Sequence, residues 1–516
     1  LIHSFDFLSF LNKKVYTKPL FLLLWSFLSF DTMEKIVQLC ARRGFIFQGS
    51  KVYGGLRGSY DYGPLGVQMK KNLSDLWWKD FVERRTDCVG LDSSIVSHPK
   101  VWEASGHVEE FTDPLTECGK CQQRVRADHL LETVLSPQDV AEMSMKGMKE
   151  AIVEHGIVCP SCGAPSHKLG EPCEYNLLFS TTLGATAAPH HADDTSAPPA
   201  NVAYLRPETA QGAYINFSQV VSSTRKRIPF GIGQIGKAFR NEIHPSNFLF
   251  RTREFELMEL QYFCHPDAAA EAYQEWTRFC FDWLRKLGVE ENRLRLREYG
   301  PGEVAHYATA TADIEYDFPS LGWSELWGIA NRGDFDLNRH MQGCNGDRSV
   351  GTFLDPVTNE RYVPHVVEPA LGLNRAMLAL LSDAYTEEEA AAGQKGPGRT
   401  VLRLHEDIAP YKVAVLPLMK KGGMLEHAEG LWGDLLSNED GGYAADFDAT
   451  GSIGKRYRRQ DEVGTPVCIT VDQETLQNGT VTARCRDTQA QVRVDQTELL
   501  EIGGYKRLLE KVRGAE

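Results

Sequence analysis

A polar hairpin between residues 239 and 259 constrains the fold of this chain more than any other stretch. Its sequence reads F-R-N-E-I-H-P-S-N-F-L-F-R-T-R-E-F-E-L-M-E. Two strands are predicted, joined by a polar turn through Pro245 and Asn247. Alternate residues of a strand share one face. The residues that this spacing places together on the second strand are Arg251, Arg253, Phe255, Leu257 and Glu259.

That face would offer two guanidinium groups, an aromatic ring and a carboxylate to a single ligand. Guanidinium suits phosphate, an aromatic ring suits a planar base, and a carboxylate suits an ammonium group. Arg240 and Glu242 add a further pair of charges where the first strand ends. The hairpin therefore predicts a site for a nucleotide beside an amino acid. The alternative is a solvated hairpin, which leaves unexplained why aromatic and charged groups share a strand face.

The composition is that of a soluble globular protein with room for two or three domains. The 516 residues are 42% hydrophobic and 24% charged, and the formal net charge is −14. This acidic balance argues against a protein that coats nucleic acid without sequence preference. A local basic patch would still allow a nucleic-acid partner.

Residues 1–32 differ from the rest, because they are rich in Phe and Leu and start without methionine. Their longest apolar run, Leu20–Trp25, is too short to span a bilayer, so we expect no membrane segment. We expect translated upstream sequence ahead of a start at Met33, and hence a cytoplasmic protein. The alternative is a targeting peptide, because a basic region precedes the apolar run, and this would imply organellar import.

Shifts in composition divide the remainder of the chain. Residues 33–400 form one predicted unit, interrupted by an insertion at 113–175 and a polar loop at 181–200. A surface linker is predicted near 386–400. Beyond it, strands and helices alternate through residues 401–516, which is typical of a separate α/β domain.

Two C-x-x-C pairs in the insertion predict one structural metal site. The four cysteines are Cys118, Cys121, Cys159 and Cys162. Paired knuckles of this spacing direct four thiolates at a tetrahedral zinc ion, and such a closed shell has no open position for catalysis. Gly119 and Gly163 are expected to supply the relaxed backbone of the knuckle turns. The alternative is four ordinary free cysteines. The scattered positions of the other cysteines indicate a reducing compartment.

Three further stretches carry charged groups of the same kind. L-R-P-E-T-A-Q-G places Glu208 in a polar turn, and W-S-E-L-W surrounds Glu325 with tryptophans. V-V-E-P-A-L-G-L-N-R puts Arg375 near a predicted helix start, from which it can reach a terminal phosphate. Each has an ordinary alternative: a helix cap, a salt bridge or a solvated residue. Their order and chemical type together favour a site.

The hairpin resembles motif 2 of the class II aminoacyl-tRNA synthetases, which reads F-R-x-E, a variable loop and R-x-x-x-F. Residues 366–381 are similar to motif 3, and the region through Pro99 is similar to the dimer-forming motif 1. The strings Y-G-G-L-R-G-S-Y-D-Y-G-P-L-G, R-P-E-T-A-Q-G and Q-I-G-K-A-F-R-N-E are similar to the homodimeric glycyl-tRNA synthetases, as is the cysteine module, which resembles the bacterial type. The likeness runs from Met33 to about Leu500.

This resemblance implies roles for the charged residues. Arg240 is the expected catalytic residue, because it would contact the ATP α-phosphate and the glycine carboxylate. The expected ATP site comprises Arg240, Asn241, Glu242, Arg251, Thr252, Phe255, Glu325, Leu326 and Arg375. Glu325 would also help to bind Mg²⁺. The expected glycine site comprises Glu208, Glu259, Glu368, Pro369 and Ala370. Many relatives have serine at the position of Ala370, which has no hydroxyl group to offer glycine.

The resemblance also implies an architecture and a set of partners. The expected fold is an α+β catalytic domain with a central antiparallel sheet flanked by helices, a zinc-ribbon-like insertion and a C-terminal α/β anticodon-binding domain. Basic residues at 455–459, K-R-Y-R-R, are expected to contact tRNA. The implied partners are glycine, ATP with Mg²⁺, tRNA(Gly) and a second copy of the chain. No editing domain is expected, because a glycine pocket excludes larger side chains sterically.

Two alternatives remain at this point. The first is a class II synthetase for threonine, serine or proline. Against it, the sequence around Glu208 and Glu259 shows no further polar or apolar pattern for a larger amino-acid pocket. The second alternative is an inactive synthetase-like protein that binds tRNA. Intact Arg240, Glu242, Phe255 and Arg375 argue against that second alternative.

Overall fold

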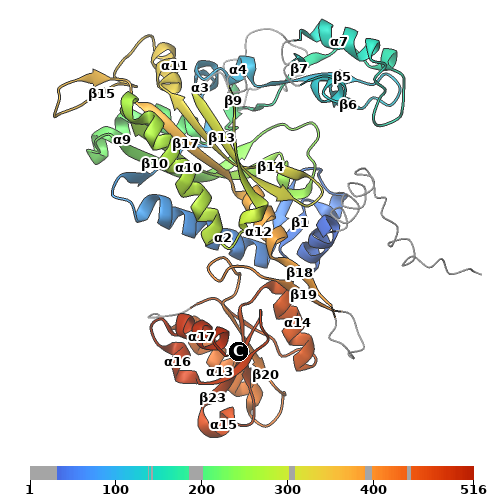
Figure 1. The fold of residues 1–516 in the computed structure, drawn as a ribbon, viewed down its shortest axis with the longest axis vertical. Coiled ribbons are helices and arrows are strands. Elements are labelled where there is room, and N and C mark those ends of the chain that lie inside the picture. The colour runs from blue at the N-terminus through green and yellow to red at the C-terminus, as the bar shows by residue number, and fades with distance from the viewer. Residues whose placement is uncertain are drawn as a thin grey trace, which may run out of the picture.

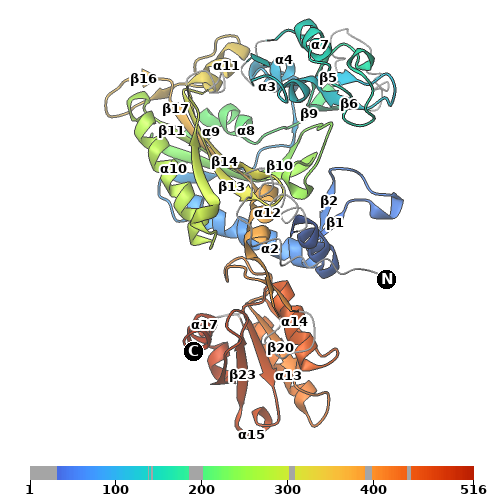
Figure 2. The same ribbon diagram turned by 45° about the vertical axis from the view of Figure 1, so that its right-hand side comes forward.

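The computed structural model describes residues 32–136, 139–140, 143–184, 202–300, 308–389, 398–438 and 443–515 (Figure 1). Residues 1–31 lie outside the described residues, as do most of the loop predicted at 181–200 and of the linker predicted at 386–400. Figure 2 shows the C-terminal domain below the body that contains the large sheet. None of the helices in the described parts of the chain is both long and apolar enough to cross a membrane.

A seven-stranded sheet forms the centre of the larger body. All neighbouring strands in it run antiparallel except β10 and β3, which are parallel at one edge. The predicted antiparallel sheet is therefore present, with one parallel pair. Its strands, in spatial order, are β12 (Leu294–Glu298), β13 (Ala310–Phe318), β14 (Gly322–Gly333), β17 (His365–Gly372), β11 (Glu254–Cys264), β10 (Phe230–Phe239) and β3 (Cys88–Gly90).

Three helices pack against one face of this sheet: α2 (Pro64–Trp78), α10 (Ala269–Lys286) and α12 (Leu373–Ala384). Helix α10 is amphipathic, and its buried residues recur at helical spacing through Trp276, Cys280 and Trp283. The three helices and the sheet bury one large apolar core, in which many of the largest side chains are aromatic. This face is closed by packing, which leaves the opposite face for ligands.

Strand β11 contributes to both faces through its alternation. Met258 and Leu260 lie in the large core, whereas Phe255, Leu257 and Glu259 line a pocket on the other face. Side chains alternate across a strand, so this division follows from the sequence. Near the far end of β11, helices α8 (Ala210–Ile215) and α9 (Phe217–Thr224) cover the pocket face and bury a second aromatic cluster.

The loop of the hairpin differs from the prediction. Strand β11 begins after Arg251 and Arg253, so these two residues are not part of it. A 3-10 turn at Phe248–Phe250, entered through the left-handed residue Asn247 with φ 59°, interrupts the strand ladder. The prediction that Arg251 and Arg253 continue the strand face is therefore wrong. The turn frees Arg251 to approach the pocket from the loop.

The insertion has a small fold and core of its own. Its sheet joins β5 (Thr112–Glu117) to β6 (Arg124–Arg126) and β7 (Cys173–Asn176), and helices α5 (Ala127–Leu131) and α7 (Met145–Glu154) pack with it. Strand β7 brings the chain back beside the start of β5. The insertion therefore leaves and rejoins the large body at neighbouring points.

The C-terminal domain is a five-stranded mixed sheet with helices, as the alternating pattern predicted. Its strands, in spatial order, are β21 (Ala445–Phe447), β20 (Val413–Pro417), β22 (Val467–Val471), β23 (Thr480–Cys485) and β24 (Gln491–Asp495). A hairpin of β18 (Tyr385–Glu388) and β19 (Arg399–Leu402) leads into it. Residues just beyond this hairpin, including Ile408 and Ala409, still pack in the large core, whereas Val413 belongs to the separate C-terminal core.

The basic stretch 455–459 is only partly available to a ligand. It lies on α14 (Ile453–Val463), where the guanidinium of Arg456 is buried and donates to the carbonyls of Pro417 and Leu418. Arg459 pairs with Asp448. The prediction that the whole run contacts tRNA is therefore wrong in part. Lys455 and Arg458 are the exposed cations of this run.

Candidate active site

A pocket lies on the open face of the large sheet, where β11, β14, β17 and the start of α12 meet the hairpin loop. Seven of the nine residues predicted for the ATP site line it, together with two predicted for glycine. They are Arg240, Glu242, Arg251, Thr252, Phe255, Glu325 and Arg375, with Glu259 and Ala370. The tertiary structure therefore joins three sequence stretches in a single pocket, namely the hairpin, the stretch around Glu325 and residues 370–375.

Arginines and carboxylates at one end of the pocket form ion pairs that a ligand can replace. Arg375 lies 3.0 Å from Glu325, with both side chains partly exposed, and its guanidinium is 4.5 Å from the ring centre of Phe250. Arg375 lowers the pKa of Glu325 against the effect of burial, and the more distant Arg240 and Arg251 add to this lowering. One guanidinium group thus pairs with this carboxylate, and two more lie within electrostatic reach of it. This balance suits a polyanion with a divalent cation.

Arg240 lies between two aromatic rings. Its guanidinium carbon is 5.3 Å from the ring centre of Phe255 and 5.4 Å from that of Phe111. The guanidinium Nε donates to the carbonyl of Pro207 at 3.2 Å, which ties the arginine to the neighbouring polar turn. Phe111 precedes the insertion, and the sequence pattern did not identify it. A rigid guanidinium in this position can stabilise charge that develops on a reacting phosphate.

Further along the same face of the sheet, Glu259 lies near other carboxylates. Glu259 accepts hydrogen bonds from the backbone N–H and the hydroxyl group of Thr209. Glu368 accepts from Gln261 at 2.7 Å and pairs with Arg332 at 2.9 Å. Glu259 is bonded to a neutral partner, whereas Glu368 is paired with a cation. The cluster therefore brings together carboxyl groups that suit an ammonium group.

Glu208 completes this carboxylate cluster from the preceding turn. It accepts from Gln211 at 3.0 Å and lies 3.4 Å from Nε2 of His107. Gln211 also donates to Asp336, which binds Arg332 through both of its oxygens. Glu208 and Glu368 thus belong to a single polar network, and Glu259 lies within electrostatic reach of both.

The pKa values of the glutamates move in opposite directions. Burial raises the pKa of Glu259, and the neighbouring carboxylates of Glu368 and Glu208 raise it further. Burial also raises the pKa of Glu368, against the effect of Arg332. For Glu208 burial acts in the same direction, but His107 and Arg332 outweigh it and lower the pKa. Glu208 is thus held ionised, and Glu259 would ionise readily only beside a new cation.

The sequence pattern missed His107 and Arg332, although both contact predicted residues. Arg332 lies near the end of β14, where the register with β17 shifts between Asn331 and Gly333. Such a shift changes which side chains face inward, and it leaves no periodic signal in the sequence. His107 comes from α4 (His107–Glu110), a short helix far from Glu208 along the chain.

Five predicted site residues do not line the pocket: Asn241, Leu326, Glu208, Glu368 and Pro369. Leu326 is buried in the large core. The side chain of Asn241 donates to the hydroxyl of Tyr175 at 2.6 Å, so it faces the insertion. Glu208 and Glu368 lie in the buried network next to Glu259. Any role of Leu326 in binding would therefore fall to its backbone.

The four cysteines of the insertion converge as predicted. All four sulfurs lie within 4.8 Å of one another, and the pairs Cys118–Cys162 and Cys121–Cys159 are 3.8 and 3.7 Å apart. A tetrahedral ion about 2.3 Å from each thiolate places the sulfurs roughly 3.8 Å apart. The donor set and its spacing therefore fit one zinc-sized ion in a closed shell.

The two knuckles share a backbone geometry. In each, the residue after the second cysteine has a positive φ, 56° at Gln122 and 66° at Gly163, and its N–H donates to the carbonyl of the first cysteine. Gly163 therefore meets the prediction of a relaxed turn. Gly119 does not, because Gln122 takes the corresponding position in the first knuckle.

Comparison with known proteins agrees with this geometry. Residues 197–384 match the tRNA synthetase class II core domain (G, H, P, S and T), and residues 412–502 match an anticodon binding domain. The chain is 49% identical to the glycine--tRNA ligase of Caldanaerobacter subterraneus subsp. tengcongensis, over 90% of this chain and 96% of that relative. It is also 49% identical to the glycine--tRNA ligase of Geobacillus kaustophilus, over 93% of this chain and 98% of the relative. The chain therefore belongs to the glycine–tRNA ligase family, with a class II synthetase core and a C-terminal anticodon-binding domain.

Proposed function

We propose that this protein activates glycine with ATP and transfers it to the 3′ end of tRNA(Gly), and that the pocket described above is where both steps occur. The observation that carries this proposal is the common wall formed by β11. Phe255 and Glu259 face the same pocket from that strand. A nucleotide against Phe255 and an amine at Glu259 would therefore lie side by side.

In the first step, the glycine carboxylate attacks the α-phosphorus of ATP, and pyrophosphate leaves. Arg240 would bind the α-phosphate and the attacking carboxylate, because it lines the pocket beside Phe255. Arg251 and Arg375 would hold the triphosphate, and Glu242 and Phe255 would hold the adenine.

Glu325 would bind Mg²⁺, which would neutralise phosphate charge when it arrives with ATP. Arg375 would then release Glu325 and pair with phosphate. The two groups are 3.0 Å apart and partly exposed, so this exchange needs little rearrangement.

Glu208, Glu259 and Glu368 would hold the glycine ammonium group. In the second step, the terminal ribose hydroxyl of tRNA attacks the glycyl carbonyl, and AMP leaves. No protein nucleophile is required, because positioning and charge neutralisation supply most of the acceleration. Ala370 and Pro369 would close the pocket around the amino acid, next to Gly328 on the adjoining strand.

The test of this function is ATP–pyrophosphate exchange measured with a panel of amino acids. Exchange that depends on glycine alone is expected. Exchange with threonine, serine or proline instead would reject the substrate. Absence of exchange with all of them would favour an inactive tRNA-binding protein.

We also propose that the cysteine site holds a structural zinc ion in a ribbon-like insertion. The sulfur spacing and the two matching knuckles support this. One zinc per chain is expected by elemental analysis, and Cys159→Ser should lose the zinc and the protease resistance of the insertion. A full zinc content in Cys159→Ser would contradict the assignment.

A homodimer and a cytoplasmic location are proposed from the family resemblance. The loop between β1 (Ile46–Gln48) and β2 (Tyr60–Tyr62) exposes Val52 and Tyr53 almost fully, as a protein contact surface would. None of the twelve cysteines, all of which lie in the described parts of the chain, forms a disulfide, which suits a reducing compartment. Analytical ultracentrifugation and cell fractionation test the two proposals.

A further inference from the structure

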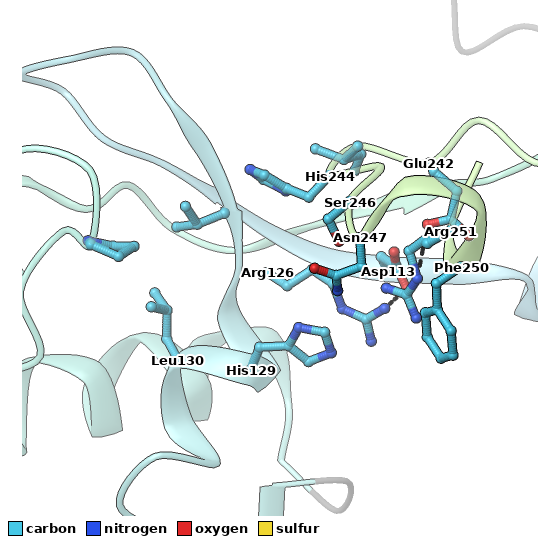
Figure 3. A pocket seen from close by; sticks show the side chains of 13 residues that line it. Asp113, Arg126, His129, Leu130, Glu242, His244, Ser246, Asn247, Phe250 and Arg251 are labelled. Carbon is cyan, nitrogen blue, oxygen red and sulfur yellow. Dashed lines mark ion pairs between the residues drawn. The ribbon is translucent and has the colours of Figure 1, made fainter. Parts of the chain in front are cut away.

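A second cavity of about 410 Å³ lies between the insertion and the hairpin loop. The insertion contributes Asp113 and Arg126 to its wall, and the loop contributes Glu242, Phe250 and Arg251 (Figure 3). The last three residues also line the candidate active site. The cavity therefore connects the insertion with the four cysteines to the groups proposed to bind ATP.

Charged side chains of alternating sign cross this cavity. Arg126 lies 2.9 Å from Asp113 and also binds Asp128, while Arg251 lies 4.0 Å from Glu242. Figure 3 shows the first pair on the insertion side and the second on the loop side, directed toward each other. Asp113 is within electrostatic reach of Glu242 and Arg251 as well as of Arg126.

Asp113 is buried, so its charge needs a cation close by. Burial raises the pKa of Asp113, and Arg126 opposes this effect. If Arg126 were neutral, the remaining guanidinium in this cavity that acts on Asp113 would be that of Arg251. Arg251 would then be drawn from Glu242 and the ATP pocket toward Asp113.

The turn between Cys118 and Cys121 joins β5, which carries Asp113, to β6, which carries Arg126. Leu115 and Arg126 are register partners across these strands. A tetrahedral ion at this turn would therefore hold Arg126 against Asp113.

We propose that Arg126 is a positioning residue for ATP: its pairing with Asp113 leaves Arg251 available to the ATP phosphates. This inference rests on the proposed function of the active site. It assigns the insertion a role in nucleotide binding, through charge and without contact between Arg126 and ATP.

The test compares Arg126→Gln, Asp113→Asn, the double variant and Arg124→Gln. Arg124 is the matched control, because it lies on the same strand and pairs with the exposed Glu117. We expect Arg126→Gln to raise the KM for ATP about tenfold, within the range of coupled sites, and to leave the KM for glycine near wild type. Asp113→Asn and Arg124→Gln should resemble wild type.

The double variant decides between positioning and general structural damage. Removing the carboxylate of Asp113 should release Arg251, so Arg126→Gln with Asp113→Asn should recover the wild-type KM for ATP. A double variant as impaired as Arg126→Gln, or an equal rise in the KM for glycine, would overturn the inference. If the wild type shows no glycine-dependent exchange, calorimetric titration with ATP applies the same comparison to binding alone, which separates this inference from the proposed reaction.

Discussion

The two halves of the active site carry charge in different ways. In the half proposed for ATP, Arg375 and Glu325 form a partly exposed ion pair, and Arg251 and Glu242 lie 4.0 Å apart. In the half proposed for glycine, Glu259 is buried and bonded to the neutral Thr209. The first half thus offers ion pairs that a ligand exchanges, and the second holds a buried carboxyl group, Glu259, whose ionisation is favoured by the cation of a ligand. A site for two charged substrates can therefore be preorganised by pairing on one side and by repulsion on the other.

The largest effect is expected from substitution of Arg240, which lies where the two halves meet. Arg240→Ala should reduce glycine-dependent exchange about 10³-fold, because it removes a fixed donor from the reacting phosphate. Circular dichroism and thermal melting should match the wild type, since the side chain is only partly buried. Near-normal exchange would show that the reacting groups lie elsewhere.

Glu259→Gln tests the half of the site that is proposed to bind glycine. Exchange should fall about 10²-fold through a higher KM for glycine, because the ammonium group loses a buried anion. The KM for ATP should change little. Equal changes in both KM values would remove the distinction between the halves.

The same variant has a predicted effect on stability. The pKa of Glu259 is raised on folding above its ordinary value of 4.5, so the folded state binds this proton more tightly than the unfolded state. The stability that Glu259 contributes is therefore complete below that value and is lost as pH rises toward the raised pKa. The glutamine in Glu259→Gln does not titrate, so the variant should have a higher melting temperature than the wild type at neutral pH. The difference in melting temperature should narrow as the pH falls to about 5, just above the ordinary pKa of glutamate. A margin independent of pH would contradict the assigned pKa shift.

His107 provides a smaller test in the glycine half. His107→Ala removes the partner of Glu208 and should raise the KM for glycine about tenfold, as expected for one hydrogen bond to a charged group. His98→Ala is a suitable control, because that side chain caps a neighbouring short helix from an exposed position. An unchanged KM for glycine would show that Glu208 needs no support from His107.

The smallest expected effect is that of ionic strength on the KM values for the two substrates. Partly exposed charges are screened by ions, whereas buried ones are screened much less. Raising the ionic strength to about 0.5 M should therefore raise the KM for ATP by about two- to threefold more than the KM for glycine. A larger effect on glycine would reverse the comparison.

Much of the site could be predicted from the sequence because its parts lie within short stretches. The strand alternation that places Phe255 and Glu259 on one face is a local property of the backbone. The cysteine knuckles are equally local, and their four sulfurs meet as the spacing indicated. Motif resemblance supplied Arg375, which lies at the start of α12 as expected.

Other contacts depended on packing between distant segments. Arg251 left the predicted strand because a 3-10 turn ends the ladder early, and Arg456 turned inward because backbone carbonyls of Pro417 and Leu418 accept from it. Periodicity assigns a residue to a face of its own element, but it carries no information on what another element places opposite.

The sequence by itself determined the chemistry of this protein: a strand with an aromatic ring and a carboxylate on one face, flanking arginines, and two metal knuckles. Only the tertiary structure decided how these groups are balanced. His107 and Arg332 come from separate segments, and each sets the charge of a group that the motifs contain, while Arg126 does so for Asp113 beside the hairpin loop. The reason is physical, because electrostatic energy depends on distance and burial in the folded chain, and neither is encoded in the order of neighbouring residues.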